Sequence, residues 1–272
     1  MRDYFIFDGL DSRRYDAYVF DVDAHNAPAK QVNTATVPGR SGDLLLPGWR
    51  FGNVAQSYDV IILKNFERNY TELRNFLLSR EGYCRLEDSI HPDEFYTAYF
   101  ASDIQPEYRT RKGYGKFRLT FTRKPQRWLK SGEQEIVLRD GGSAVASTVT
   151  NPTRFACYPE FHFQGNAMSS GCAVQWQFSY PLEPGYNLGL QTKVTFKSYS
   201  GTGYAKLNNG TDVTLDMETL QCYASGDYFN TAIQYTMNER FPFQLGVGNN
   251  AFTFTNAARI TRLALKPRWY IL

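Results

Sequence analysis

Apolar and polar residues alternate along most of the chain. In GKFRLTFT, Phe117, Leu119 and Phe121 share one face of an extended segment. This period of two residues is typical of a half-buried β-strand. The alternation recurs, between Gly, Asn and Pro residues spaced as in antiparallel sheets, in SYDVIIL, CAVQWQFSY, KVTFKSY, TDVTL, AFTFTN and ITRLALKPRW. The chain is therefore predicted to be mainly β.

The segment KNFERNYTELRNFLLSREG breaks this alternation. Its apolar residues recur at spacings of four, three and four, which places them on one stripe of a helix. These residues are Phe66, Tyr70, Leu73 and Leu77. We expect one amphipathic helix that packs on a sheet, with Gly82 as its C-terminal cap.

The composition changes at FTRKPQRWLKSGEQE. Pro125 is expected to end a strand there, and a polar stretch follows it. At 272 residues the chain is long for one hydrophobic core. Two domains are predicted, residues 1–132 and 133–272. The second contains only strand and turn patterns, which favours a β-sandwich.

The charge balance does not point to a nucleic-acid or membrane partner. Lys and Arg number 30 against 27 Asp and Glu, a net charge of +3. The first residues show no signal-peptide pattern, and no apolar run is long enough to span a bilayer. We expect a protein that is made and folded in a cytoplasm.

Cysteine and histidine spacing indicates neither a disulfide framework nor a metal site. The cysteines, expected to be reduced and mostly buried, are Cys84, Cys157, Cys172 and Cys222. The histidines, far apart in the sequence, are His25, His91 and His162. No metal ion and no cofactor are predicted.

The best catalytic candidate is LEDSIHPDEFY, where a histidine stands among carboxylates and could act as a general base. The residues concerned are Glu87, Asp88, His91, Asp93 and Glu94. The competing interpretation is a strand that ends in a turn, because Asp, Ser and Pro form turns. We favour the turn, since residues adjacent in sequence seldom converge as catalysis requires. No G-x-S-x-G motif is present, and no enzyme activity is predicted.

The stretch VPGRSGDLLLPGW contains three glycines and two prolines. A phosphate-binding P-loop needs a lysine after its second motif glycine and then a helix, and neither follows Gly39 and Gly42. The glycines, Gly48 included, instead permit the positive φ angles of a flexible or extended hairpin. Its leucines have no evident local core, so we expect them to contact a partner.

Aromatic residues of the second half suggest a sugar-binding alternative, in which rings stack on saccharides. The candidates are Trp176, Tyr180, Tyr186, Tyr199, Tyr204 and Tyr223. Core packing is the competing interpretation. Trp176 shares a strand face with Val174 and Phe178, so we predict that it lies in the core.

The order of motifs over nearly the whole chain resembles the distal tail (Dit) proteins of long-tailed phages, especially those of Gram-positive hosts. The motifs are VPGRSGDLLLPGWRFGNV, SYDVIIL with the helix after it, GYCRLEDSIHPDEFYTAYF, GKFRLTFTRKPQRWLKSGE, NPTRFACYPEFHFQGNA, TLDMETLQCY, FPFQLGVGNNAFTF and LALKPRW. The resemblance implies an N-terminal β-sandwich or barrel with one helix and a projecting hairpin. It also implies a C-terminal sandwich like those of galectins and carbohydrate-binding modules.

The resemblance further implies a structural role. Six copies would form a ring that joins the tail tube to the adsorption apparatus at the tail tip or baseplate and lets DNA pass through its lumen. Implied partners are other copies of the chain, the tail tube protein, a tail-tip protein, and a receptor-binding protein or host cell-wall saccharide. Neither sequence-specific nucleic-acid binding nor membrane insertion is implied. The protein would assemble in the bacterial cytoplasm and reside in the virion.

Closing a ring requires one patch of a subunit to meet a different patch on the next. We expect the hairpin to supply the first patch. The predicted contact residues are Arg40, Asp43, Leu44, Leu45, Leu46 and Trp49. The alternative function is an adhesion module, in which the C-terminal domain recognises cell-wall glycan and oligomerisation supplies avidity.

Overall fold

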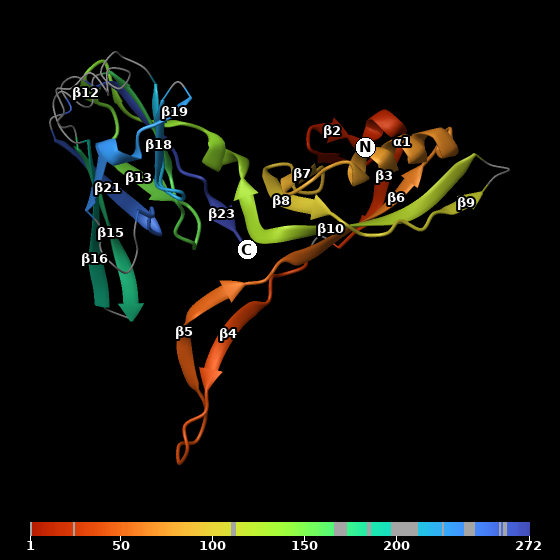
Figure 1. The fold of residues 1–272 in the computed structure, drawn as a ribbon, viewed down its shortest axis with the longest axis horizontal. Coiled ribbons are helices and arrows are strands. Elements are labelled where there is room, and N and C mark those ends of the chain that lie inside the picture. Colours follow the sequence, from red (N-terminus) through yellow and green to blue (C-terminus); the bar gives the residue numbers. More distant parts are fainter. Residues whose placement is uncertain are drawn as a thin grey trace. The chain divides into compact units, whose positions relative to one another are not determined.

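The computed structural model describes residues 2–23, 25–109, 113–165, 173–183, 186–196, 212–224, 226–236, 243–255, 257 and 260–272. The chain divides into two compact units, at Trp128 and Leu129, and each has its own hydrophobic core. Figure 1 colours the chain from the N-terminus in red to the C-terminus in blue. The protein is mainly β, as the alternation predicts.

The first unit is built on an antiparallel sheet with the strand order β2-β1-β7-β8-β10-β6-β3, and β9 also pairs with β10. The strands are β1 (Phe5–Phe7), β2 (Leu10–Asp11), β3 (Ala17–Val22), β6 (Val54–Ile62), β7 (Cys84–Asp88), β8 (Glu94–Phe100), β9 (Glu107–Arg109) and β10 (Tyr114–Leu129). A bridge between Asp3, just before β1, and Val19 on β3 closes the sheet into a barrel. Of the two expected forms, sandwich or barrel, the closed sheet corresponds to the barrel.

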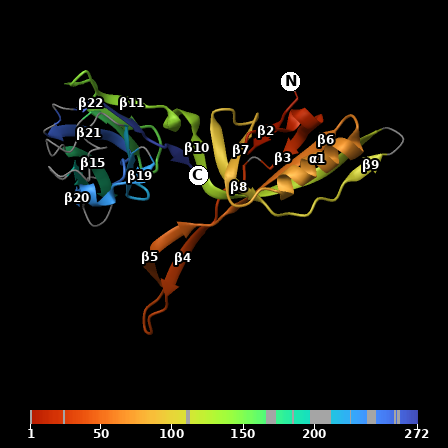
Figure 2. The ribbon, with the colours of Figure 1, turned by 45° about the horizontal axis from the view of Figure 1, so that its top comes forward.

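The helix α1 (Phe66–Leu78) covers the sheet beside β6, as Figures 1 and 2 show. Its buried residues are the predicted stripe, Phe66, Tyr70, Leu73 and Leu77. The Tyr70 ring packs edge-on against Phe117, 5.3 Å between centroids.

The prediction that Gly82 caps the helix is wrong. The helix ends one turn earlier because the hydroxyl of Ser79 donates to the Phe76 carbonyl, 2.8 Å away. The backbone N–H of Ser79 also bonds the last turn. Gly82 serves the turn that precedes β7, with a φ of +75°.

Strand β10 alternates as predicted, with Phe117, Leu119 and Phe121 all buried. The prediction that Pro125 ends this strand is wrong, since β10 continues to Leu129. Proline is tolerated because pairing between β10 and β6 stops at Arg123, so no β6 partner needs a proline N–H.

Two strands form a separate antiparallel hairpin, β4 (Lys30–Ala35) and β5 (Leu44–Phe51), which projects from the barrel of the first unit (Figure 1). At its base, the Gly52 N–H donates to the Ala29 carbonyl at 3.0 Å. Within the described residues, the first core draws none of its members from the stretch 30–51. The hairpin is therefore an appendage whose described side chains lie outside the core.

The second unit is a sandwich of two antiparallel sheets, β12-β11-β22-β14-β17-β18-β19 and β13-β21-β15-β16-β20. The strands of these sheets are β11 (Ile136–Asp140), β12 (Ser143–Ala144), β13 (Thr148–Asn151), β14 (Glu160–Gly165), β15 (Ala173–Glu183), β16 (Tyr186–Phe196), β17 (Val213–Asp216), β18 (Gln221–Ala224), β19 (Asp227–Tyr228), β20 (Ile233–Thr236), β21 (Gly248–Thr255) and β22 (Ile260–Lys266). The short strand β23 (Tyr270–Ile271) belongs to neither sheet and pairs with β10. The core contains the packed rings of Phe161, Trp176 and Phe252.

Short 3₁₀ turns are the other helical elements of the described chain: Ser12–Tyr15, Lys130–Glu133 and Asn230–Ala232. None of the described helices combines the length and the apolar character needed to cross a membrane. Cys157 and Cys222 are buried and Cys84 is half-buried, all three as free thiols, while Cys172 lies outside the described residues.

Candidate functional site

The hairpin presents leucines on both of its faces. Leu45 lies opposite Thr34 in the strand register, and Leu46 lies opposite Asn33. Because successive side chains of a strand point to opposite faces, Leu45 faces one way and Leu44 and Leu46 the other. Leu45 is 62% exposed and Leu46 is 41% exposed. A two-stranded ribbon with apolar side chains on both faces has the surface expected of an interaction element.

The tip of the hairpin is an ordered turn. Gly39 and Gly42 adopt φ angles of +80° and +81°, as their predicted role requires. The Thr36 hydroxyl donates to a carboxylate oxygen of Asp43 at 2.9 Å, which ties the two sides of the turn together. Arg40 is exposed at the tip. A strand, β5, begins at Leu44 just after the turn, so the turn lacks the helix on which a phosphate loop depends.

The six predicted contact residues therefore belong to one element. Leu44 is half-buried, Arg40, Asp43, Leu45 and Leu46 are exposed, and Trp49 lies on β5 with a side chain outside the described part. Sequence reasoning missed three further exposed apolar residues around the hairpin, Val32, Val37 and Phe51. The signal for Val32 was weak because KQVNTA contains few apolar residues.

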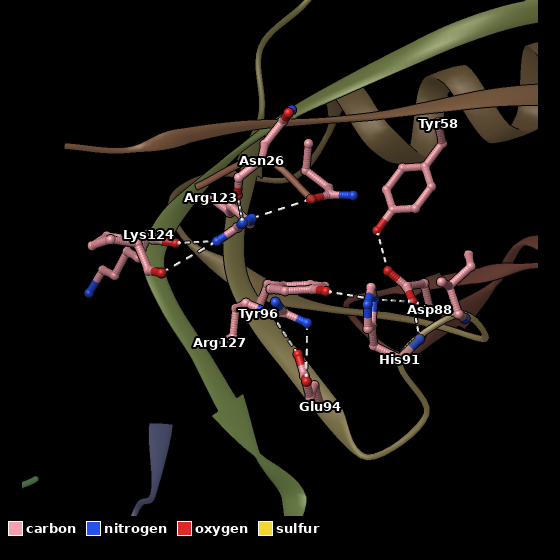
Figure 3. A network of polar contacts seen from close by, with 12 residues as sticks. Asn26, Tyr58, Asp88, His91, Glu94, Tyr96, Arg123, Lys124 and Arg127 are labelled. Carbon is pink, nitrogen blue, oxygen red and sulfur yellow. Dashed lines mark hydrogen bonds and ion pairs between the residues drawn. The ribbon is translucent and has the colours of Figure 1, made fainter. Parts of the chain in front are cut away.

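Asp88, His91 and Glu94 of the predicted catalytic cluster belong to a structural network of polar contacts (Figure 3). Asp88 ends β7 and is 4% exposed. Its carboxylate accepts hydrogen bonds from the backbone N–H groups of Ile90 at 3.0 Å and His91 at 2.8 Å. It also accepts one from the Tyr58 hydroxyl at 2.9 Å. Asp88 therefore fixes a turn, as the competing interpretation predicts.

Of the other members of that cluster, His91 stays beside Asp88, with its Nδ1 3.7 Å from a carboxylate oxygen, and the remaining carboxylates have separate contacts. Glu94 pairs with Arg127 through two hydrogen bonds of 2.7 and 3.1 Å. Glu87 accepts from Arg85 at 2.6 Å, and Asp93 is exposed in the turn. His91 Nδ1 lies 3.3 Å from the Tyr96 hydroxyl. The carboxylates thus meet guanidinium and backbone groups instead of converging on one point.

Arg123 is a buried cation at the base of the hairpin (Figure 3). The side chain is 1% exposed, and its Nη2 donates to the Asn26 carbonyl at 2.9 Å. Its Nε donates to Gln56 at 3.3 Å, and its Nη1 lies 3.4 Å from the Lys124 and Pro125 carbonyls. Burial lowers the pKa of this guanidinium. Arg123 on β10 thereby links Asn26, which precedes the hairpin, to Gln56 on β6, the strand after the hairpin.

The histidines do not assemble a metal site. His25 and His91 are brought together, with ring centroids 6.4 Å apart, while His162 belongs to the second unit. Across the described residues, no group of three or more His, Cys, Asp or Glu side chains has an arrangement that could hold a metal ion.

In the second unit, Trp176 is fully buried and its indole N–H donates to the Gln244 carbonyl at 2.9 Å. The prediction that it is a core residue is confirmed, and its ring cannot stack on a sugar. Tyr223 packs against Tyr228, which is 67% exposed. The other candidate rings have side chains outside the described residues: Tyr180, Tyr186, Tyr199 and Tyr204.

A charged cluster lies on the outer side of β14, opposite the buried Phe161 and Phe163. Glu160 accepts from His162 at 2.7 Å and pairs with Arg268. The hydrogen bond from His162, against the opposing effect of burial and with help from nearby cations, lowers the pKa of Glu160 to about 2. This cluster anchors the start of β14, a central strand of its sheet, to Arg268.

No family model matches the chain, and no curated protein sequence matches it either. Solved structures do match. The SPP1 Dit protein, described as a paradigm of the hub adsorption apparatus in phages that infect Gram-positive bacteria, superposes with a TM-score of 0.66 at 16% identity over 97% of each chain. A structure of the phage p2 baseplate in its activated conformation with Sr matches with a TM-score of 0.51 at 11% identity, again over 97% of each chain. The chain therefore has the Dit fold.

Proposed function

We propose that this chain is a phage distal tail protein whose copies close into a homohexameric ring at the end of the tail tube. The observation that carries the proposal is the hairpin, an ordered element that exposes leucines on both faces and contributes nothing to the described core of its own unit. The likeness to SPP1 Dit over 97% of both chains supports the same role. In this proposal the protein is structural and acts by association, without catalysis.

In the proposed ring, the two units have different roles. Residues 1–132 form the ring, with Arg40, Asp43, Leu44, Leu45, Leu46 and Trp49 reaching the next copy. The lumen passes DNA, and the ring joins the tail tube protein to the tail-tip proteins. Residues 133–272, a sandwich, present an outward platform for other baseplate components. The protein is assembled in the host cytoplasm and resides in the virion tail.

The test compares two exposed apolar positions with the same exposed fraction. Leu45 on the hairpin and Val145 in the second unit are each 62% exposed. We expect Leu45→Asp to abolish rings while leaving a folded monomer, because an exposed side chain contributes little to folding. Trp49→Ala should likewise abolish rings. Val145→Asp should form rings like the wild type. Light scattering and negative-stain microscopy measure the outcome.

Two results would reject the proposal. One is a Leu45→Asp protein whose rings survive dilution and salt as well as wild-type rings do. The other is a wild-type protein that stays monomeric even when mixed with its tail tube protein.

A further inference from the structure

We infer that the hairpin of one copy docks into a shallow groove on the outer face of β10 in the next copy. The groove is lined by Phe20, Asp59, Gln105, Glu107, Arg118 and Thr120. This inference rests on the proposed ring and names the surface that receives the hairpin.

The groove follows β10 between two rims. It consists of two adjoining depressions that share Gln105 and Arg118. Its floor is the outward side of β10, because Phe117 and Leu119 point into the core and Arg118 between them points out. One rim is the segment before β9, held by the hydrogen bond from the Ser102 hydroxyl to the Thr120 carbonyl at 2.9 Å.

The other rim presents an exposed aromatic ring. The β3–β6 register shifts between Val19 and Asp21, which makes Phe20 the extra residue of a bulge. A bulge redirects a side chain, and Phe20 is 53% exposed. The ammonium of Lys116 lies 4.8 Å from its ring centroid. Phe20 thus offers an apolar contact for a leucine at the edge of a charged groove, the arrangement of an interface anchor within a polar rim.

The charges of groove and hairpin are complementary. Three acidic side chains line the groove against two basic ones, namely Asp59, Asp103 and Glu107 against Lys116 and Arg118. Arg118 is already paired with Asp23 and with Asp59, so Asp103 and Glu107 against Lys116 leave the groove acidic. The stretch 30–51 instead has an excess of basic residues, with Lys30, Arg40 and Arg50 against Asp43. Such complementarity selects the partner and its orientation.

Hairpin and groove are separate patches of one subunit, as a heterologous ring contact requires. No described residue of the stretch 30–51 lines the groove. The eight residues of β5 span about 26 Å at the usual strand rise, enough to cross from one subunit to another. One copy can therefore give its hairpin to the next and receive another in its own groove.

Paired cysteines test the contact directly. In the variant Leu45→Cys/Gln105→Cys, mild oxidation should produce a ladder of linked chains up to the hexamer on a denaturing gel. Each single variant should give no ladder beyond that of the wild type. The control Leu45→Cys/Leu78→Cys, which uses an equally accessible position on α1, 58% exposed, should also give none.

Charge reversal tests the complementarity without a new covalent bond. Arg40→Glu/Arg50→Glu should weaken ring formation at least tenfold in the concentration needed. Adding Asp103→Lys/Glu107→Lys to the same chain should recover most of the lost ring formation. Rings that form normally with no specific ladder, or a double reversal that fails to rescue, overturn the groove assignment while the proposed ring stands. Absence of rings from the wild type with its tail tube protein overturns both.

Discussion

Replacing Asp88 with alanine should destabilise the first unit by about 3 kcal/mol. The substitution removes a buried carboxylate that accepts three hydrogen bonds of 2.8 to 3.0 Å. The Tyr58 hydroxyl is left fully buried without its acceptor, which costs about 1–3 kcal/mol. The two backbone N–H groups are only partly buried, so water replaces the carboxylate at about 0.5–1 kcal/mol each.

The hydroxyl of Tyr58 remains a donor at all ordinary pH values. Burial and the negative charge of Asp88 raise the pKa of Tyr58 well above its ordinary value. A double-mutant cycle with Tyr58→Phe therefore isolates the hydroxyl–carboxylate bond. We expect a coupling of about 1–2 kcal/mol, so the double variant should lose less stability than the two single variants together.

The assay must separate the two units of the chain. Urea unfolding followed by pulsed hydrogen–deuterium exchange and mass spectrometry does so, because peptides from β7 and β8 report on the first unit alone. Asp93→Ala is the matched control, since Asp93 lies in the same turn but is exposed, and it should change stability by less than about 0.5 kcal/mol. A loss below about 1 kcal/mol for Asp88→Ala, or additive single variants, would refute the reasoning.

Two further predictions concern packing and acid stability. Gly115→Ala should lower the free energy of unfolding of the first unit by about 2 kcal/mol, because a Cβ there would lie 2.3 Å from the buried Phe66 ring. The control Gly52→Ala, whose Cβ would have its nearest neighbour at 3.6 Å, should change that free energy by less than about 0.5 kcal/mol in the same urea assay. For Glu160, the pKa falls from its ordinary 4.5 to about 2 on folding, so its stabilisation is complete above pH 4.5 and is lost as the pH falls toward 2. The loss is about 3 kcal/mol, and Glu160→Gln should flatten that part of the pH–stability curve for peptides of β14; an unchanged slope would contradict the assignment.

The periodicity of apolar residues predicts which side chains of a helix or strand face the core. The apolar stripe of α1 and the alternation along β10 both follow from side-chain spacing alone, and the burial of Leu73 and Phe121 agrees with them. The two turn predictions at Gly39 and Gly42 succeed for the same reason, because a positive φ is a property of one residue.

Features that depend on distant partners were missed or misplaced. The pattern around Pro125 suggests the end of a strand, yet the strand continues where its neighbour β6 has stopped pairing. Arginine is usually a surface residue, so the sequence gives no sign that Arg123 is buried. Its burial depends on hydrogen bonds to Asn26 and Gln56, which are far from it in the sequence. The groove likewise joins β3, β6 and β10, segments far apart in the sequence, and no local pattern marks it.

The independence of the hairpin from the described core has a consequence for the order of events in assembly. Because the barrel closes around residues outside the stretch 30–51, a newly made chain reaches its native fold before it meets another copy. In the proposed ring, the exposed leucines of the hairpin stay in contact with water until a second subunit arrives, so the free energy of their burial is released at association. On this proposal, folded single subunits persist until the first contacts between copies form, and mutations in the hairpin should alter the yield of assembled rings without altering the yield of folded protein.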